Sequence, residues 1–407
     1  MTLGPSDGVV VVGASLAGLN AVQALRGAGF EGSVCFIGAE AHLPYDRPPL
    51  SKLYLAGRAE REQLALYGVD KLAEQAVDVR VGVAATSLDL SARRVGLADG
   101  SSVAFDGLVI ATGGTVRTLP GIAPGLAGVH VLRSVDDSDG LRADLARSPR
   151  RVVVVGAGFI GAEVAATCRE LGFEVSLVEA AAAPLAHAVG AEIGRTIIDV
   201  HREHGVDVRV GVGVAGLDGT QRVEAVRLAD GSVIEADVVV IGVGVAPAVG
   251  WLEGSGLTLD NGVVCDESLL AAPGVVAAGD CARWPNPVYD GELMRVEHWD
   301  NAIAQGGHAA RRLLGDSSLE PFRAVPWFWS DQYDRKLHLA GRVRADDEVC
   351  VVSGSIEERR FAALYRRGDR VVGCFGMNRP RHVMQFRALI ERHGSWSEGL
   401  ELVEKLG

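Results

Sequence analysis

Two stretches of the chain open with a run of valines and continue into an alanine-rich segment with helical periodicity. The first reads VVVVGASLAGLNAVQAL from residue 9, and the second reads RVVVVGAGFIGAEVAATC from residue 151. A second apolar run follows each helical segment, SVCFIGA in the first stretch and VSLV in the second. Apolar runs of this kind predict strands, so each stretch is expected to form a strand–helix–strand unit.

Glycines at fixed spacing join each valine run to its helical segment, as in a dinucleotide-binding fingerprint. The fingerprint positions are Gly13, Ser15 and Gly18 in the first unit and Gly156, Gly158 and Gly161 in the second. The first position permits the tight turn, the middle one lets a pyrophosphate approach the helix N-terminus, and the third brings helix and strand close. Ser15 departs from the all-glycine pattern and could add a hydroxyl donor. Glu40 and Glu179 follow the second apolar runs, where a carboxylate accepts from ribose hydroxyls.

Because one such unit binds one dinucleotide, the pair predicts two cofactors between which a hydride or electrons pass. Glycine-rich turns also occur in α/β proteins that bind no nucleotide, an alternative that two motifs with matching acids disfavour.

The two units end in similar segments, LADGSSVAFDGLVIATG and LADGSVIEADVVVIGVG, which form an internal repeat with hairpin signals at the DG pairs. A later run, LLAAPGVVAAGDCARW, supplies a strand that we assign back to the first unit. From residue 321 the pattern changes to short strands and a helix over 381–392. The sequence therefore predicts an α/β fold with two Rossmann-like dinucleotide-binding domains and a C-terminal α+β domain. The expected boundaries are 1–115 with 246–320, the inserted 116–245, and 321–407.

Composition limits the partners. The 407 residues carry a net charge of −12, which argues against nucleic acid, although residues 321–407 hold 15 Lys and Arg against 12 Asp and Glu. No apolar run approaches the roughly 18 residues of a membrane span, and the start MTLGPSDG lacks a secretory pattern. The six cysteines have no metal-ligand spacing, so no metal is expected. A cytoplasmic protein, monomeric or homodimeric, is predicted.

Six motifs in order along the chain carry a family resemblance: HLPYDRPPLSK (42–52), ATGG (111–114), GAGFIGAEVA (156–165), AAGD (277–280), EHWDNA (297–302) and PWFWSDQ (326–332). They resemble the FAD-dependent, NADH-utilising ferredoxin reductases of bacterial oxygenase systems. The resemblance implies a glutathione-reductase-like flavoprotein with an FAD domain, an inserted NAD domain and a C-terminal domain beside the flavin. It also implies electron transfer from NADH through FAD to a [2Fe–2S] ferredoxin, which supplies a cytochrome P450 or a Rieske oxygenase.

The resemblance also implies roles for single residues. Glu40 is expected at the FAD ribose and Arg47 at its phosphates, although Arg47 could instead be a loop arginine paired with Asp46. Asp280 is expected at the ribityl hydroxyls and the backbone of Trp299 at the flavin ring, on a helix with Asp300 or Asn301 near its cap. The remaining cofactor-binding candidates are Thr112, Gly113, Arg133 and Gly244.

Three residues are candidates for the reaction itself. Phe159 is expected at the nicotinamide pocket, and Glu163, one helical turn later, resembles a family glutamate that pairs with a lysine, here Lys52, beside the flavin N5. Both charges could instead be ordinary surface groups. Glu179, followed by Ala180–Ala183 without an arginine, favours NADH over NADPH. Ala248 replaces the family's usual asparagine, which weakens a side-chain contact at that position.

Other functions remain open at this stage. A thiol-based flavoprotein needs a reactive cysteine near the flavin, and DRPPLSKLYLAG contains none. Rubredoxin reductase, NADH oxidase and a redox sensor resembling apoptosis-inducing factor are further alternatives. An acidic ferredoxin is expected to dock among basic residues, which are Arg311, Arg312, Arg335, Lys336, Arg379 and Arg381.

Overall fold

The computed structural model describes residues 3–66, 68–119 and 125–406. Contacts between Cα atoms divide the chain into two compact units. Unit 1 consists of Met1–Asp46, Leu64–Thr115 and Ala246–Pro326, and unit 2 of Arg47–Gln63, Val116–Val245 and Trp327–Gly407. Unit 2 combines the expected NAD segment with the C-terminal segment, so the division into three domains stays a prediction.

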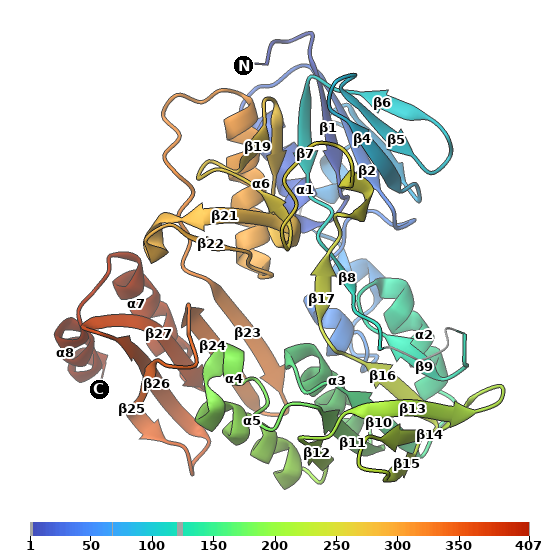
Figure 1. The fold of residues 1–407 in the computed structure, drawn as a ribbon, viewed down its shortest axis with the longest axis vertical. Helices are drawn as coiled ribbons and strands as arrows, with labels where there is room; N and C mark the ends of the chain where they lie inside the picture. The colour runs from blue at the N-terminus through green and yellow to red at the C-terminus, as the bar shows by residue number, and fades with distance from the viewer. Residues whose placement is uncertain (1–2, 67, 120–124, 407) are drawn as a thin grey trace. The chain divides into compact units, whose positions relative to one another are not determined.

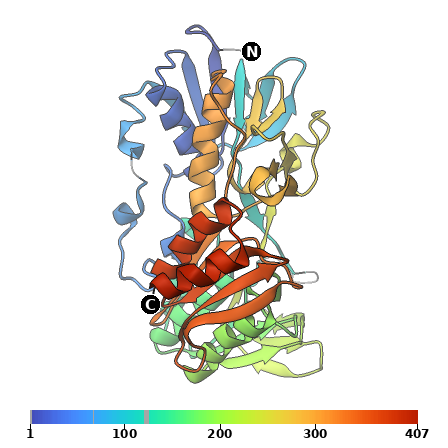
Figure 2. The same cartoon turned by 90° about the vertical axis from the view of Figure 1, so that its left-hand side faces the viewer.

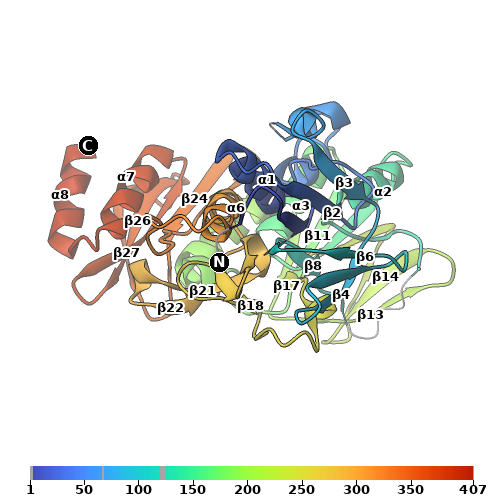
Figure 3. The same cartoon turned by 90° about the horizontal axis from the view of Figure 1, so that it is seen from above.

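A six-stranded sheet forms the centre of unit 1 (Figure 1), with the strand order β19-β20-β7-β1-β2-β3. Its strands are β1 (Gly8–Val12), β2 (Ser33–Gly38), β3 (Val77–Val81), β7 (Gly107–Ile110), β19 (Leu270–Ala272) and β20 (Val275–Ala277). Strand β20 pairs in parallel with β7, which confirms that the late apolar run returns to the first sheet. Helix α1 (Leu16–Gly27) connects β1 to β2 and packs beside α6 (Trp299–Leu313), as Figure 3 shows.

Small three-stranded sheets complete unit 1, the first antiparallel and the second mixed. One contains β4 (Ala85–Asp89), β5 (Arg94–Leu97) and β6 (Ser102–Ala104), which confirms the first predicted hairpin. The other contains β18 (Val263–Val264), β21 (Ala282–Asn286) and β22 (Glu292–Met294). Short 3₁₀ helices are η3 (Val69–Lys71), η4 (Gly250–Leu252), η5 (Gly279–Cys281) and η6 (Pro287–Tyr289).

The nucleotide-binding part of unit 2 repeats this architecture. Its parallel sheet has the order β12-β11-β10-β16-β9, so β10, β11 and β16 take the places of β1, β2 and β7. The strands are β9 (Val129–Val131), β10 (Arg151–Val155), β11 (Glu174–Glu179), β12 (Asp207–Val210) and β16 (Val238–Ile241). The helices are α2 (Val135–Leu145), α3 (Phe159–Glu170), α4 (Ala186–Val189) and α5 (Ala191–Glu203). The second hairpin appears in the sheet of β13 (Val214–Gly219), β14 (Val223–Leu228) and β15 (Val233–Glu235). The internal repeat is therefore confirmed.

The C-terminal part of unit 2 is an antiparallel sheet with the order β23-β24-β27-β26-β25. Its strands are β23 (Trp327–Gln332), β24 (Arg335–Gly341), β25 (Glu348–Ser355), β26 (Arg360–Arg367) and β27 (Arg370–Met377). Helices α7 (Pro380–Glu391) and α8 (Trp396–Leu406) lie on one face of it (Figure 2). Apolar side chains of α4 and α5 pack with those of the sheet in one buried cluster. The pattern predicted α7 to within one residue, whereas α8 was not anticipated.

The remaining regular elements are short. Strands β8 (Gly114–Val116) and β17 (Val245–Pro247) pair as a two-stranded ribbon, and η1 (Pro48–Ser51) and η2 (Arg61–Leu64) flank the segment that carries Lys52. Among the helices formed by the described residues, none has both the length and the apolar character that crossing a membrane requires.

Candidate functional site

The first glycine turn, in unit 1, depends on two positions that only glycine can occupy. Gly13 has φ of 120°, and a Cβ there would lie 2.1 Å from the carbonyl oxygen of Ala111. A Cβ at Gly18 would lie 2.1 Å from the carbonyl oxygen of Gly13. Ser15 is the N-cap of α1, and within the described residues its hydroxyl makes no capping bond. The first backbone N–H groups of α1 lie beside this tight glycine turn, which fits a pyrophosphate.

Glu40, two residues beyond β2, is half-buried and accepts a hydrogen bond from the Tyr45 hydroxyl. Its backbone carbonyl accepts from Gly82 N at 2.8 Å, which fixes the loop. A carboxylate has about four acceptor positions, and accepting from ribose hydroxyls suits such a group. Tyr45 was not singled out from the sequence, although it lies inside the HLPYDRPPLSK motif.

Thr112 and Gly113 lie at the end of β7 and are tied to Ala248. The Thr112 hydroxyl donates to the carbonyl of Ala248 at 2.7 Å, and the Ala248 N–H donates to the carbonyl of Gly113 at 2.9 Å. Gly113 has φ of 68°, in the left-handed region that favours glycine. Both contacts use the backbone of Ala248, so the departure from asparagine leaves this arrangement intact.

Asp280 and Trp299 belong to two elements of unit 1 that contact each other, η5 and α6. Asp280 is in η5 directly after β20, and its carbonyl accepts from Arg295 at 2.9 Å. Trp299 is the first residue of α6 and donates its indole N–H to Asp46 at 2.8 Å. The N-cap of α6 is His298, so Asp300 and Asn301 lie near the cap, in the first turn of the helix, as expected.

The second glycine turn, in unit 2, is more open at its middle position. A Cβ at Gly156 would lie 2.3 Å from the carbonyl of Gly242, and one at Gly161 would lie 2.0 Å from the carbonyl of Gly156. Around Gly158, the N-cap of α3, no described heavy atom would come within 4 Å of a Cβ. This position leaves space for a pyrophosphate, so the turn fits a second dinucleotide. Gly244, at φ of 98°, accepts from the backbone N–H of Arg117 at 2.9 Å.

The Glu179 carboxylate ends β11 and is held by two backbone groups. The N–H groups of Ala157 and Ala181 each donate to one of its oxygens at 2.8 Å. A hollow of about 590 Å³ lies at the end of β12, where Gly211 and Gly213 approach the loop that follows Glu179. Arg209, which the sequence analysis did not consider, lines this hollow and pairs with Asp207 at 2.9 Å.

Arg47 and Arg133, both in unit 2, are linked. The Arg47 guanidinium donates to the backbone carbonyl of Arg133 at 2.6 Å. Arg133 precedes Ser134, which forms a capping box with Asp137 at the start of α2. Arg47, predicted to bind phosphate, and the cofactor-binding candidate Arg133 therefore lie together at the N-terminus of a helix.

The predicted ion pair of unit 2 is present. Lys52 Nζ lies 3.0 Å from Glu163 Oε2, and the side chains are 17% and 3% exposed. The Ser51 hydroxyl also donates to Glu163 Oε2 at 2.5 Å, and the Ser330 hydroxyl donates to Oε1 at 2.7 Å. The alternative that both charges are ordinary surface groups is therefore wrong. The two serines were missed, although both lie within the quoted motifs.

Phe159, the first residue of α3, packs on Phe328 of β23 with ring centroids 4.4 Å apart. The contact joins the start of the helix that carries Glu163 to the strand that carries Ser330. Phe159 is only half-buried, so part of its ring remains available to a ligand.

The cysteines give no sign of a reactive thiol. All six are free, and only Cys350 is exposed. Burial raises the pKa of Cys35, Cys168 and Cys265 to about 12, so these thiols stay protonated near neutral pH. The chemistry of the site cannot depend on these three as nucleophiles.

Known proteins resemble the chain over nearly its whole length. Residues 7–306 match the family described as pyridine nucleotide-disulphide oxidoreductase, and residues 327–400 match the one described as reductase C-terminal. Rhodocoxin reductase of Rhodococcus erythropolis is 38% identical over 94% of this chain and 89% of its own length. Putidaredoxin reductase of Pseudomonas putida is 37% identical over 95% and 92%. The crystal structure of a covalent putidaredoxin reductase–putidaredoxin complex matches with a TM-score of 0.92 and 34% identity over 98% of both chains.

Proposed function

Because the chain belongs to the pyridine nucleotide-disulphide oxidoreductase family, whose members join FAD to a nicotinamide nucleotide, we propose that it passes electrons from NADH to a [2Fe–2S] ferredoxin. The observation that carries the proposal is the pair of glycine turns, one in each unit, each followed by a strand that ends near a carboxylate. Bound FAD supplies the chemistry, since it accepts a hydride from NADH and gives up electrons singly. The complex of the related reductase with putidaredoxin supports a ferredoxin partner.

Unit 1 is proposed to hold the FAD. The turn of Gly13 and Gly18 and the N-terminus of α1 bind the pyrophosphate, and Glu40 accepts from the adenosine ribose. Asp280 accepts from the ribityl hydroxyls. The N-terminus of α6, at Trp299, would offer the positive end of the helix dipole to negative charge on the flavin. Arg47 is proposed as a further phosphate contact and Arg133 as a cofactor-binding residue.

The second glycine turn is proposed to hold NADH. Gly158 leaves the space that the pyrophosphate needs, and Glu179 accepts from the adenosine ribose. Its carboxylate repels a 2′-phosphate, and the nearby Arg209 is already paired with Asp207, so NADH is preferred over NADPH. The hollow at the end of β12 offers room for the adenosine.

Lys52, Glu163 and Phe159 are proposed to orient the reacting groups rather than to shuttle protons. Direct hydride transfer requires no acid or base, so positioning and charge carry the rate. Lys52 offers a fixed positive charge because buried Glu163 holds its ammonium group.

The ferredoxin is proposed to dock on basic side chains. We rank the candidates by how far their charge is already paired within the protein. Arg311 pairs with Asp316 at 2.6 Å and Arg335 with Asp334 at 3.1 Å, so part of their charge is already neutralised. Arg312 donates to the hydroxyl of Ser268 at 2.7 Å. Exposed Lys336 and Arg381 are therefore the first positions for charge reversal, followed by Arg379.

A reconstitution experiment tests the proposal. The purified protein is expected to be yellow with an FAD spectrum, to lose that absorbance when NADH is added, and to reduce cytochrome c faster when a [2Fe–2S] ferredoxin is present. A colourless protein that takes up no FAD would overturn the cofactor assignment. If NADH bleaches the FAD but ferredoxins do not increase the rate of cytochrome c reduction, the result would point instead to an NADH oxidase or a redox sensor.

We place this activity in the cytoplasm, where NADH is regenerated, and expect the ferredoxin to supply a cytochrome P450 or a Rieske oxygenase. If the protein is purified from a cytosolic fraction together with one ferredoxin, both statements are supported. Recovery of the active protein from another compartment would contradict the first.

A further inference from the structure

The Glu163 carboxylate is the end point of a path of hydrogen bonds that continues beyond Ser330. Gln332 Nε2 donates to Ser330 Oγ at 3.1 Å, and Gln332 Oε1 lies 3.0 Å from His201 Nε2. His201 Nδ1 lies 3.1 Å from the Tyr333 hydroxyl. We call Tyr333, His201, Gln332 and Ser330 the buried polar chain, since all except half-buried Tyr333 are at most 1% exposed.

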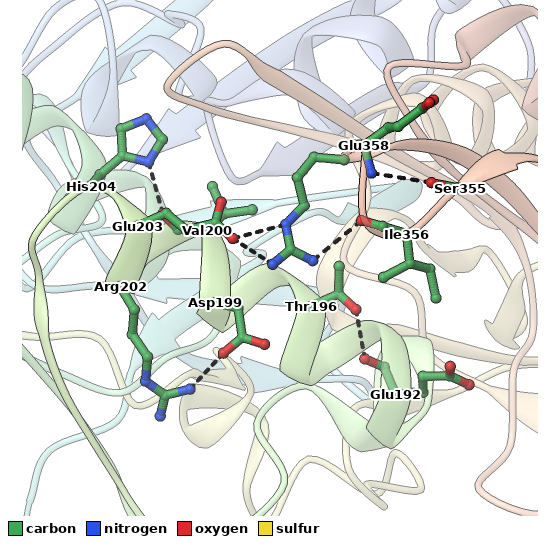
Figure 4. Close-up of polar contacts among 11 residues, drawn as sticks. Glu192, Thr196, Asp199, Val200, Arg202, Glu203, His204, Ser355, Ile356 and Glu358 are labelled. Atoms are coloured by element: carbon green, nitrogen blue, oxygen red, sulfur yellow. Dashed lines mark hydrogen bonds and ion pairs between the residues drawn. The ribbon is translucent and has the colours of Figure 1, made fainter.

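Two parts of unit 2 hold the buried polar chain in place. His201 is on α5, whereas Ser330 and Gln332 are on β23. Arg359, in the turn between β25 and β26, ties α5 to the C-terminal sheet. Its guanidinium donates to Glu203 of α5 at 2.5 Å and to the carbonyl of Ile356 at 3.3 Å, two partners that Figure 4 labels. The Tyr365 hydroxyl donates to the carbonyl of Val189, in α4, at 2.6 Å. The helix that carries His201 is therefore fixed against the C-terminal sheet.

The chemistry of each group fixes where the protons lie. Ionised Glu163 can only accept, so the single hydroxyl proton of Ser330 points to it. Ser330 Oγ must then accept from Gln332, which turns the amide NH₂ toward Ser330 and the amide oxygen toward His201. An amide oxygen only accepts, so His201 carries its proton on Nε2.

The last bond has the same direction. Burial lowers the pKa of His201 to about 4, so the imidazole is neutral near pH 7 and its Nδ1 accepts. Burial raises the pKa of Tyr333, so its hydroxyl keeps the proton and donates. Every donor of the buried polar chain thus points toward Glu163, and the bond dipoles reinforce one another.

We propose that the buried polar chain holds the Glu163 carboxylate in one orientation and in this way positions Lys52. The hydrogen bonds of the buried polar chain polarise one another but transfer no proton, because the Gln332 amide cannot pass a proton from His201 to Ser330. Its members are positioning residues for the reaction, and only the part played by Lys52 in that reaction rests on the proposed function.

The first test reads the tautomer directly. In protein labelled with ¹⁵N-histidine, the ring signals of His201 are assigned by their loss in His201→Gln. We expect a single neutral tautomer protonated on Nε2 near pH 7 and a mixture of tautomers in Ser330→Ala, whereas Ser330→Thr, which keeps the hydroxyl, retains the Nε2–H form. A wild-type proton on Nδ1, or a tautomer unaffected by Ser330→Ala, would overturn the proposal.

The second test separates positioning from mere structure. At saturating NADH, the bleaching rate of bound FAD is expected to fall about tenfold in Ser330→Ala, the effect of losing one hydrogen bond to a charged group. The NADH concentration for half-maximal rate should change less than about twofold in Ser330→Ala. The variant Ser330→Thr should bleach at the wild-type rate. An unchanged bleaching rate, or no restoration by threonine, would show that the chain is only structural. Wild-type FAD that NADH does not bleach would instead refute the proposed function and leave the tautomer result standing.

Discussion

The carboxylate of Glu179 accepts the backbone N–H of Ala157 at 2.8 Å. The acid at the end of β11 is therefore tied to the glycine turn that begins α3. One bond thus couples the residue proposed to read the ribose to the turn proposed to hold the pyrophosphate, and it orients the carboxylate before any nucleotide arrives.

Replacing Glu179 should change the nicotinamide preference. In Glu179→Gln the negative charge is lost while a hydrogen-bonding group remains, so the repulsion of a 2′-phosphate disappears. We expect kcat/KM for NADPH relative to NADH to rise at least about tenfold, which corresponds to about 1.4 kcal/mol. Glu174→Gln, at the exposed start of the same strand, is the control and should leave the ratio unchanged. A wild-type preference for NADPH would contradict the assignment.

Replacing the middle glycine of the second turn should weaken NADH binding without affecting the stability of the fold. A Cβ at Gly158 meets no described atom within 4 Å and the backbone φ is −67°, so Gly158→Ala should fold with an unchanged melting temperature. The added methyl group occupies the space proposed for the pyrophosphate, and KM for NADH should rise about tenfold or more. Gly27→Ala, equally uncrowded at the end of α1, should leave both quantities unchanged. Normal NADH kinetics in Gly158→Ala would place the nucleotide elsewhere.

Two ion pairs join the segment 47–63 to α3 and differ in burial, which makes them a matched comparison. Lys52→Met leaves the Glu163 charge buried without its cation, and urea unfolding should show a loss of about 3–5 kcal/mol. Arg58→Met breaks the exposed pair with Glu170 and should cost less than about 1 kcal/mol. Lys52→Met combined with Glu163→Gln should recover part of the loss. Equal losses in the two single variants would mean that burial does not set the energy of the Lys52 pair.

Thiol reactivity should distinguish this protein from thiol-based flavoproteins. Cys350 is the one exposed cysteine, so a thiol reagent should modify about one group per native chain and all six after denaturation. Cys350→Ser should abolish the rapid native reaction without affecting the bleaching of FAD by NADH. A second fast thiol whose modification stops that bleaching would revive the thiol-based mechanism.

Buried His201 should make stability fall in acid. Burial lowers its pKa in the folded protein to about 4 from the ordinary value of 6.5, so the unfolded chain binds the proton first as the pH decreases. Stability is fully present above about pH 6.5 and is lost toward pH 4, by about 3 kcal/mol from this group. His201→Gln should reduce the slope of unfolding free energy against pH in this window, whereas His187→Gln, at an exposed position, should not. Identical slopes in wild type and His201→Gln would contradict the assignment.

The parts of the fold that the sequence predicted are those with a local signal. The valine runs, the glycine spacing and the DG turns each lie within about 30 residues, so both strand–helix–strand units and both hairpins could be read directly. The return of β20 to the first sheet was predicted because the second unit was already complete. Helix α8 was missed because the sequence prediction placed the last helix at residues 381–392 and assigned no element after it.

The partners of Glu163 show where such prediction ends. The helical spacing and the family motif indicated Lys52, but Ser51 and Ser330 lie 112 and 167 residues from Glu163 along the chain. No periodicity links His201 to Gln332 either, since their contact depends on how α5 packs on the C-terminal sheet. Side-chain networks of this kind are set by tertiary packing, and only the structure could reveal them.

The position of β20 also bears on biosynthesis. Its residues leave the ribosome after β16 has already emerged, so the middle nucleotide fold has all its strands available while the sheet begun by β1 still lacks β19 and β20. Domains generally fold as units during synthesis, and pairings between distant segments form slowly. The exposed flank of β7 must therefore stay soluble on the nascent polypeptide until the downstream strand arrives to cover it.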